Sequence, residues 1–305
     1  MSLISEKAGK LTHARQDTAS LLAPIFTHVG KVKGERPKDT VYYTYNGATI
    51  TFKLFEKLDA TEQSILFGIV ALASLEKREL PENGSEAVQG LLQKLNKVEE
   101  GSFEYGASVG FKTTYHALLQ ASGMGRSQQS KDRLLKGLER LEGARYIVKK
   151  GTKRHAGENL IAVGFDEQND EIFIGLSSIL AYAMENQFTY VNLQERKQLG
   201  SNLGITHLVH SRLCAVINAG SSHKFNVERL CHTIAGKIRR EVNEDGSYED
   251  VKEQLEKSKL KNIKLQVVRA MEKIDGLEGW SAEPKGKGAN LVYTVKRPLF
   301  EVEES

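Results

Sequence analysis

Two groups of side chains in this 305-residue sequence combine amides with cations at helical spacing. Residues three and four positions apart share one face of an α-helix, so each group would project from a single surface. An amide offers both a hydrogen-bond donor and an acceptor, whereas lysine and arginine bind phosphate oxygens through charged donors. The chemistry that these types support is recognition of base edges and phosphates. The first group is Gln129, Arg133, Lys136 and Arg140, and the second is Asn262, Gln266, Arg269 and Lys273, preceded by Lys259 and Lys261.

Positive charge gathers around both groups. The whole chain carries a formal net charge of +4, but residues 126–154 hold ten lysines and arginines against three acidic residues. Residues 257–297 hold ten against four, so the rest of the chain is net negative. A single charged run is usually a solvated helix face. Two basic windows that coincide with the two groups instead favour a pair of surfaces for nucleic acid.

A short pattern surrounds each group. A helical segment is followed by Leu-Glu-Gly, an extended run, a basic tip and then Gly-x-Asn-Leu. Leu-Glu-Gly stands at 141–143 and 277–279, and Gly-x-Asn-Leu stands at 157–160 and 288–291. A helix followed by a hairpin with a cationic tip is typical of a winged helix. The tip cations are Lys149, Lys150, Lys153 and Arg154 in the first copy, and Lys285 and Lys287 in the second.

Apolar periodicity predicts the helices that would position these side chains. Apolar residues recur at intervals of three and four over 128–142 and 260–277, which indicates two amphipathic helices. A short helix precedes each of them, one running from a Thr113 cap to Gly123 and the other from an Asn226 cap to Gly236. Each pair then forms a helix-turn-helix. The predicted core stripes are Leu134, Leu138 and Leu141 in the first long helix, and Ile263, Val267, Met271 and Ile274 in the second.

Other local signals predict the elements around these pairs. Asn46-Gly47 supplies a tight turn for a hairpin over 41–52. Asp59 and Glu62 form a capping box at the start of an apolar helix. A further helix is expected over 202–218. The predicted strands after the first long helix are 145–150 and 159–165, with 171–176 as a third that pairs across Asn169-Asp170.

The expected fold class is α+β, with two tandem winged-helix domains. Residues 1–38 are predicted to form a polar arm, 39–190 the first domain and 191–305 the second. The second unit is longer than the first between the cap of its short helix and Leu-Glu-Gly, which places an insertion at about 237–259 with a helix-like run over 248–257. This insertion is either a solvated loop or an additional element that contacts DNA or a partner.

Several functions are excluded or disfavoured by the sequence. It has no apolar signal region, no membrane-spanning run and only two cysteines, which fits a reducing cytoplasm. It has no phosphate-binding Gly-x-x-x-x-Gly-Lys-Ser/Thr motif and no His-x-His motif, so we expect neither an enzyme nor a cofactor. His207, His210 and Cys214 fall on one helix near Cys231-His232, but they lack the paired short spacings of a zinc site. We therefore expect no metal.

Three segments resemble the RepC family, the replication initiators of IncQ-type plasmids. They are 11–24, which reads LTHARQDTASLLAP, then 208–218, which reads LVHSRLCAVIN, and 227–231, which reads VERLC. The resemblance extends over about residues 11–298, and the opening segment is its most specific part. The insertion departs from the shorter form of the family, so residue-level comparison around the second turn is not supported.

This resemblance implies a protein that binds directly repeated origin sequences, called iterons, with tandem winged helices. It further implies that bound protein helps to melt an adjacent AT-rich segment and admits a plasmid-encoded helicase and primase, with a part in plasmid copy control. Related initiators exist as monomers and homodimers. Two other functions remain compatible with the residues themselves: a transcriptional regulator that uses the same two modules, and a protein-interaction scaffold.

Overall fold

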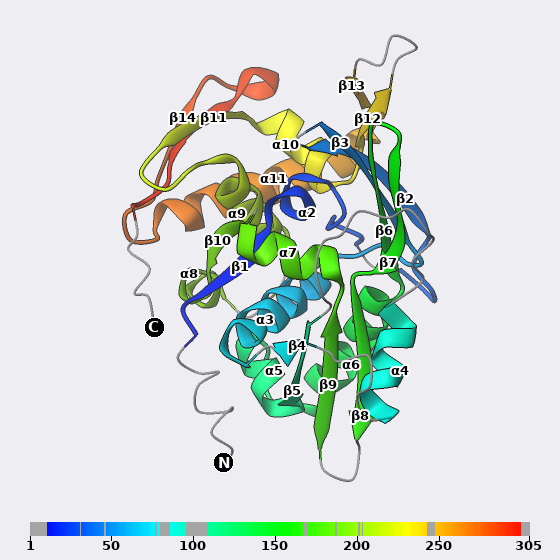
Figure 1. Cartoon of the computed structure of the whole chain (residues 1–305). Coiled ribbons are helices and arrows are strands. Elements are labelled where there is room, and N and C mark those ends of the chain that lie inside the picture. The colour runs from blue at the N-terminus through cyan, green and yellow to red at the C-terminus, as the bar shows by residue number, and fades with distance from the viewer. Residues whose placement is uncertain are drawn as a thin grey trace.

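The computed structural model describes residues 11–299 apart from 31, 46, 77, 80–85, 96–108, 167–169, 187, 201, 203 and 243–247. It has a mixed α/β fold, in which helices and antiparallel sheets pack around one large hydrophobic core, with a second small cluster under α4 (Figure 1). None of the described helices is long and apolar enough to cross a membrane. The expected mixture of helices with antiparallel strands is therefore confirmed.

The first described segment belongs to the core of the fold. Strand β1 (His13–Asp17) pairs with β10 (Phe188–Asn192), and helix α2 (Thr18–Leu22) follows at once. Ala14, Leu21 and Ile25 are buried. The predicted arm is therefore wrong for residues 11–26; the described residues from 27 to 38 form no helix or strand and are mostly exposed, and residues 1–10 lie outside the described part. Local sequence patterns did not predict β1, because its partner strand β10 lies far along the chain.

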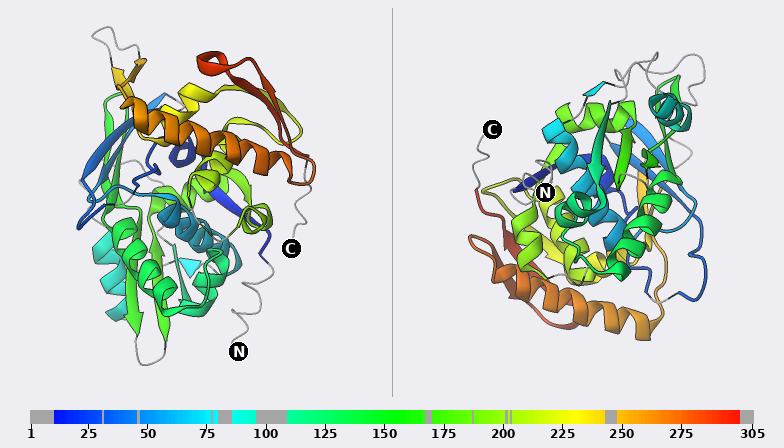
Figure 2. Two further views of the ribbon diagram at one scale, coloured as in Figure 1. Left: turned by 180° about the vertical axis from the view of Figure 1, so that it is seen from behind. Right: turned by 90° about the horizontal axis from the view of Figure 1, so that it is seen from below.

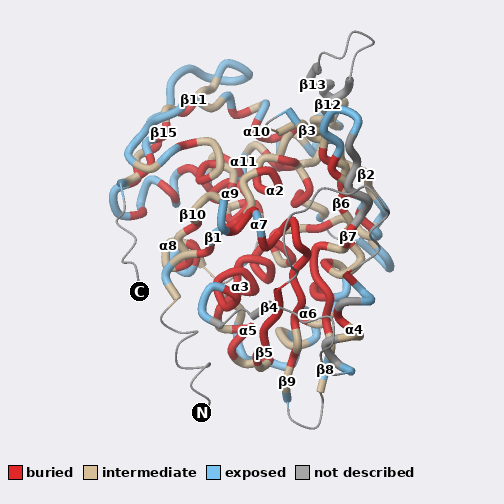
Figure 3. The backbone as a smooth tube through the Cα atoms, in the orientation of Figure 1, coloured by how far each residue is buried: buried red, intermediate tan, exposed pale blue. Residues whose placement is uncertain are grey.

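Helix α3 (Ala60–Glu76) lies at the centre of the molecule and is buried on nearly every side (Figure 3). The predicted capping box starts it. Asp59 Oδ1 accepts a hydrogen bond from the Thr61 amide at 2.7 Å, and Glu62 Oε2 accepts one from the Asp59 amide at 2.7 Å. These two bonds satisfy amides that the first helical turn leaves without a partner.

The predicted 41–52 hairpin is confirmed as part of a four-stranded sheet. Gly47 has φ of +73° in its turn, a conformation that favours glycine, while Asn46 lies outside the described residues. The sheet has the order β2-β3-β6-β7, and a turn at Gly151 and Thr152 joins its last two strands. Its strands are β2 (Asp39–Tyr45), β3 (Ala48–Leu54), β6 (Ala144–Lys150) and β7 (Lys153–Asn159).

The return strand of this first cationic hairpin differs from the prediction. The return strand is β7 over 153–159, whereas 159–165 was expected. The apolar run Ile161–Asp166 instead forms β8 of another sheet. There β8 pairs with β9 (Glu171–Leu176), as expected. The apolar run needs cover on both faces, and helix α4 (Glu86–Leu95) packs over Ala162. The second sheet has the order β4-β5-β9-β8, with β4 (Arg78–Glu79) and β5 (Val109–Thr114).

The first predicted helix pair, α5 and α6, joins these two sheets. Helix α5 (Tyr115–Ala121) is capped by Thr114, whose hydroxyl accepts from the Ala117 amide at 3.1 Å, so the predicted Thr113 cap is wrong by one residue. Gly123 ends the turn after α5 with φ of +69°. Helix α6 (Gln128–Glu142) has the predicted bounds. Its predicted core stripe of Leu134, Leu138 and Leu141 is fully buried.

The second half follows a simpler order. After α7 (Ser178–Asn186), β10 and α8 (Leu193–Gln198), helix α9 covers Ile205–Val216, a shorter span than the predicted 202–218. Strand β11 pairs with β15, and β15 pairs with β14, so the last hairpin and β11 form one three-stranded sheet. The remaining elements are β11 (Ser222–Asn226), α10 (Val227–Ile234), α11 (Lys257–Asp275), β14 (Ser281–Lys285), a short 3-10 turn η1 (Gly288–Asn290) and β15 (Val292–Lys296).

The insertion in the second unit is a β-hairpin. Strand β12 (Ile238–Val242) pairs antiparallel with β13 (Tyr248–Lys252), and residues 243–247 between them lie outside the described part. The predicted helix-like run over 248–257 is therefore wrong, because α11 begins only at Lys257. A polar strand gains its stability from its partner, which the composition of one segment does not reveal.

The two halves are joined by a buried polar network. Arg196 of α8 is buried, donates to Ser64 Oγ of α3 at 2.7 Å, and donates to Ser211 Oγ of α9 at 2.7 Å. Ser211 Oγ in turn donates to Gln63 Oε1 at 2.8 Å. The predicted domain boundary between residues 190 and 191 falls inside β10, a strand that pairs with β1. The two units therefore share one core across the described chain.

We predict that Gly68→Ala destabilises the protein by about 1–3 kcal/mol, the usual cost of overpacking. An added Cβ at Gly68 of α3 would lie 2.5 Å from Ser122 Oγ and 2.9 Å from the Ser122 amide nitrogen. The matched control is Gly90→Ala in α4, where an added Cβ meets no atom within 4 Å. That variant should gain about 0.5–1 kcal/mol from helix propensity. Chemical denaturation measures both, and an unchanged midpoint for Gly68→Ala contradicts the packing argument.

Candidate nucleic-acid interface

Helix α11 presents the second predicted group on its exposed face. Ile263, Val267, Met271 and Ile274 are buried as predicted, and in the left view of Figure 2 the helix crosses the near side of the molecule. Asn262, Gln266 and Arg269 make no hydrogen bond or ion pair with any described residue, which leaves their polar atoms available to a ligand. The exposed predicted residues are Lys259, Lys261, Asn262, Gln266, Arg269 and Lys273.

The last hairpin is fastened beside α11. Lys264 Nζ donates to the Gly288 carbonyl at 2.5 Å, and Asn226 Nδ2 donates to the Ala289 carbonyl at 3.3 Å. Gly286 has φ of +82°, and an added Cβ there would lie 2.5 Å from the Asn290 carbonyl oxygen, so glycine is required. The predicted tip cations Lys285 and Lys287 are exposed. Helical spacing could not predict that Lys264 anchors the hairpin, since its carbonyl partner lies 24 residues away.

Helix α6 presents three of the four residues in the first predicted group. Gln129, Arg133 and Lys136 are exposed, and none of them bonds to another described residue. Ser127 caps the helix by accepting a hydrogen bond from the Ser130 amide at 3.2 Å. The exposed trio therefore stands on a helix whose opposite face is fixed in the core.

Arg140, the fourth member, has a structural role. Its guanidinium donates to Glu56 at 2.8 Å and to Glu62 at 3.1 Å, and the Glu62 side chain is fully buried. Arg36 binds the same Glu62 carboxylate at 2.7 Å. Arg140 thus holds α6 against α3, and we remove it from the candidate interface. Spacing along α6 placed it near the polar face but could not reveal acidic partners elsewhere in the chain.

The first cationic hairpin pairs lysine and arginine positions across its two strands. The strand register places Lys149 opposite Arg154 and Lys150 opposite Lys153. Lys149 and Lys150 are exposed, while the side chains of Lys153 and Arg154 lie outside the described part. The two exposed lysines give this tip a positive charge, which suits contact with an anion such as phosphate.

The inserted hairpin β12–β13 connects the two candidate surfaces. It leads directly into the N-terminal end of α11, and it lies beside the tip of β6–β7 in both Figure 1 and the left view of Figure 2. Strand β12 also packs against β2 of the first sheet. The first cationic tip therefore stands near the start of α11, although the two are more than 100 residues apart in sequence.

The two copies of the sequence pattern are not equivalent in space. Gly157–Leu160 covers the end of β7 and the residue after it, whereas Gly288–Leu291 lies in the tip of the second hairpin. Leu-Glu-Gly ends α6 in the first copy, but in the second it follows α11, which has already ended at Asp275. Tyr146 and Trp280, the aromatic residues after Leu-Glu-Gly, are buried in both copies.

The structure groups the potential metal ligands near α9 differently from the sequence pattern, which had placed His207, His210 and Cys214 together. His207 turns toward Arg196, whereas Glu195, His210 and Cys214 bring their ligand atoms within 4.8 Å of one another. His210 Nε2 already lies 2.8 Å from Glu195 Oε2. The Cys214 sulfur is 3.8 Å from Nε2 and 4.0 Å from Nδ1 of the same ring. This geometry suits a buried Glu–His pair better than a zinc site.

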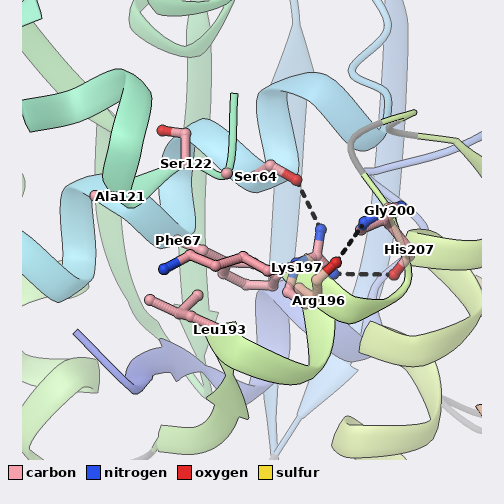
Figure 4. Close-up of a pocket in the computed structure, with 10 residues that line it drawn as sticks. Ser64, Phe67, Ala121, Ser122, Leu193, Arg196, Lys197, Gly200 and His207 are labelled. Atoms are coloured by element: carbon pink, nitrogen blue, oxygen red, sulfur yellow. Dashed lines mark hydrogen bonds between the residues drawn. The ribbon is translucent and has the colours of Figure 1, made fainter. Parts of the chain in front are cut away.

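A small cavity lies beside the buried polar network of Arg196 and Ser64, between α3, α5 and α8 (Figure 4). Its volume is about 20 Å³, which is room for about one water molecule and not for a substrate. Ser122 Oγ and His207 Nδ1 belong to residues that line it, and both atoms are buried without a hydrogen-bond partner in the described chain. The cavity therefore suits a bound water better than a cofactor.

His207 should make the protein less stable in acid. Burial and the nearby Arg196 guanidinium lower the pKa of His207 to about 3 from its ordinary value of 6.5. Between these two pKa values, His207 is protonated in the unfolded chain but neutral in the folded chain. The contribution of His207 to folding stability is therefore complete above pH 6.5 and is lost as the pH falls below it. The loss is at most about 1.4 kcal/mol per pH unit.

We predict that His207→Gln, whose amide can still donate to the Arg196 carbonyl, shows a shallower loss between pH 6.5 and 4.5 than the natural sequence. Urea denaturation across that range measures the slope. His210→Gln is the control and should keep the natural slope in acid, because Cys214 and Glu195 outweigh burial and raise the pKa of His210 to about 9. Identical acid slopes for His207→Gln and the natural protein contradict the assignment.

Comparison with known proteins identifies the family. The family model for Replication protein C (RepC) matches residues 8–282. No curated protein sequence matches the chain. A crystal structure of selenomethionine derivatives of domains 2 and 3 of RctB covers 93% of this chain and 99% of that chain, with 8% identity and a TM-score of 0.51. A second crystal structure of RctB domains 2–3 covers 89% of this chain and 95% of that chain, with 10% identity and a TM-score of 0.46.

These similarities differ in what they establish. At 8% identity, the likeness to RctB concerns the fold alone. The family match, in contrast, includes α6, the inserted hairpin and the whole of α11, and it stops near the start of the last hairpin. It therefore spans most of the candidate interface, and the chain belongs to the RepC family of replication proteins.

Proposed function

We propose that this protein initiates plasmid replication by binding directly repeated origin sequences with two winged-helix units. The observation that carries the proposal is α11: its exposed face holds amides and cations without partners in the described chain, and a cationic hairpin is fastened beside it. A protein helix fits the major groove of DNA, where such side chains bond to base edges. The neighbouring hairpin then reaches phosphates.

The order of elements supports the winged-helix assignment of the second unit. Helix α9, strand β11, helices α10 and α11 and the hairpin β14–β15 follow in this order, with the inserted hairpin β12–β13 between α10 and α11, and β11 pairs with β15. This arrangement sets the hairpin at the side of α11. The first unit has the same helix pair and a cationic hairpin, but its strands are divided between two sheets. We infer unequal roles, with base recognition mainly by α11 and phosphate contacts mainly by the first unit.

Further steps of initiation follow from family membership as proposals. Bound protein would help to melt an adjacent AT-rich segment and admit helicase and primase, and it would act in the bacterial cytoplasm as a monomer or homodimer. The protein itself would not be an enzyme and would need no cofactor. A transcriptional regulator with the same two modules would bind the same DNA without opening it. Permanganate footprinting on supercoiled origin DNA separates these functions, since only an initiator exposes unpaired thymines.

Binding should depend strongly on salt. About eight phosphate contacts give a slope of roughly −7 for the logarithm of affinity against the logarithm of salt concentration. Footprinting on DNA that flanks the gene locates the site, and fluorescence anisotropy at increasing salt measures the slope. A flat salt dependence, or no duplex binding at low salt, rejects the proposal and favours a protein-interaction scaffold.

We predict that Arg269→Ala weakens binding to the cognate repeat by about 1–3 kcal/mol, or roughly 5- to 150-fold, with relaxed preference at one base pair. The matched control is Lys112→Ala, which removes an exposed cation from β5 at the end of the molecule far from α11 (Figure 1). Lys112→Ala should retain natural affinity for a DNA fragment that carries a single repeat. Equal affinities for Arg269→Ala and the natural protein exclude Arg269 from the interface.

The first hairpin should act through charge alone. Replacing both Lys149 and Lys150 by alanine should weaken binding to all sequences alike and reduce the salt slope by about two, because each phosphate contact contributes about 0.9. Salt titrations with cognate and unrelated duplexes measure this change. A loss confined to the cognate duplex would instead indicate base recognition by this tip.

A further inference from the structure

Leu265 occupies an unexpected place on α11. Successive residues of a helix are separated by about 100°, so Leu265 lies opposite the buried stripe of Ile263, Val267, Met271 and Ile274. Leu265 is 51% exposed. Leu265 was not among the predicted core residues because its position lies off the core stripe, and it was not among the predicted DNA-binding residues because its side chain is apolar.

The neighbours of Leu265 on the helix surface are polar. Lys261 and Asn262 precede it by four and three positions, and Arg269 follows it by four, so all three border it on the same face. Each of them is exposed. A single exposed leucine is ordinary on a protein surface. Here it stands at the centre of the surface that the proposed function presents to DNA, where water would be excluded on binding.

The major groove offers one apolar group to such a side chain. Among the four bases, only thymine carries a methyl group there, at C5, and the other groups are hydrogen-bond donors and acceptors. The cations around Leu265 match phosphates, and its amide neighbour matches a base edge. An acidic protein partner would satisfy the cations but would leave Asn262 and Gln266 without a specific role.

We propose that Leu265 is a specificity residue that contacts the C5 methyl group of a thymine in the bound repeat. This inference rests on the proposed function and adds the identity of one base. The span from Asn262 to Arg269 is roughly 10 Å at 1.5 Å per residue, which corresponds to about three steps of 3.4 Å along the duplex. The contacted thymine therefore lies within about four successive base pairs that Asn262 and Arg269 also reach.

Replacement of thymine by deoxyuridine tests the contact, because it removes only the methyl group. Each thymine of the footprinted repeat is replaced in turn, and affinity is measured by anisotropy for the natural protein and for Leu265→Ala. We expect one or two positions at which deoxyuridine weakens the natural protein about 3- to 10-fold. Leu265→Ala should bind both duplexes equally, at the weakened level.

Leu299→Ala is the matched control, since Leu299 is 76% exposed but lies outside α11. It should keep the natural response to deoxyuridine. Because Leu265 is exposed, Leu265→Ala should also keep the natural thermal midpoint, which separates a lost contact from a lost fold.

The outcomes distinguish the inference from the function on which it rests. Duplex binding with no sensitive thymine, or with the same sensitivity in Leu265→Ala, overturns the contact and leaves the DNA-binding proposal intact. Natural affinity for DNA together with lost self-association in Leu265→Ala also overturns it and assigns the residue to a protein interface. No duplex binding by the natural protein overturns the proposed function itself.

Discussion

The structure is organised around the need to cover helix α3 on every side. Residues 62–73 of this helix are all buried, including Glu62, Gln63 and Ser64 at its start. A helix that is apolar around its whole circumference cannot lie at a surface. Strand β1 and helices α5, α6 and α9 pack around it, and these elements come from both halves of the chain. The cover that α3 requires therefore unites the two units in one core.

The polar residues at the start of α3 explain how that core is held in register. Glu62 lies between Arg36 and Arg140, which fixes α6 and the segment before β2. Gln63 and Ser64 bond to Ser211 and Arg196, which fixes α9 and α8. Burial lowers the pKa of Arg196 to about 9, which shows that its charge is costly to bury. Its hydrogen bonds offset this cost, as does the Phe67 ring, whose centroid lies 4.7 Å from the Arg196 Cζ atom. Both candidate DNA-binding helices are thus anchored, directly or through α9, to the same few turns of α3.

This arrangement also accounts for the differences between the two units. The second unit keeps its strands β11, β14 and β15 in one sheet beside α11. The strands of the first unit are shared between two sheets because Ile161–Asp166 is drawn into the apolar layer under α4. What remains beside α6 is a long hairpin whose cationic tip reaches the inserted hairpin of the second unit. The chain belongs to the RepC family, and its fold is similar to that of domains 2 and 3 of RctB.

Local patterns in the sequence were sufficient for features whose causes lie within a few residues. The bounds of α6, the capping box at Asp59 and Glu62, the hairpin at Gly47 and the core stripe of α11 all follow from periodicity, capping and turn chemistry. The family, too, was recognisable from short runs of residues.

Features that depend on distant partners were decided only by the tertiary structure. Strands β1, β7 and β12–β13 are polar or short, and each exists because a partner strand supplies its hydrogen bonds. Arg140 resembled a DNA-binding residue until Glu56 and Glu62 were seen beside it. Leu265 became informative only once the surface around it was known. Spacing along a helix gives the direction of a side chain, but what that side chain meets depends on how the rest of the chain packs.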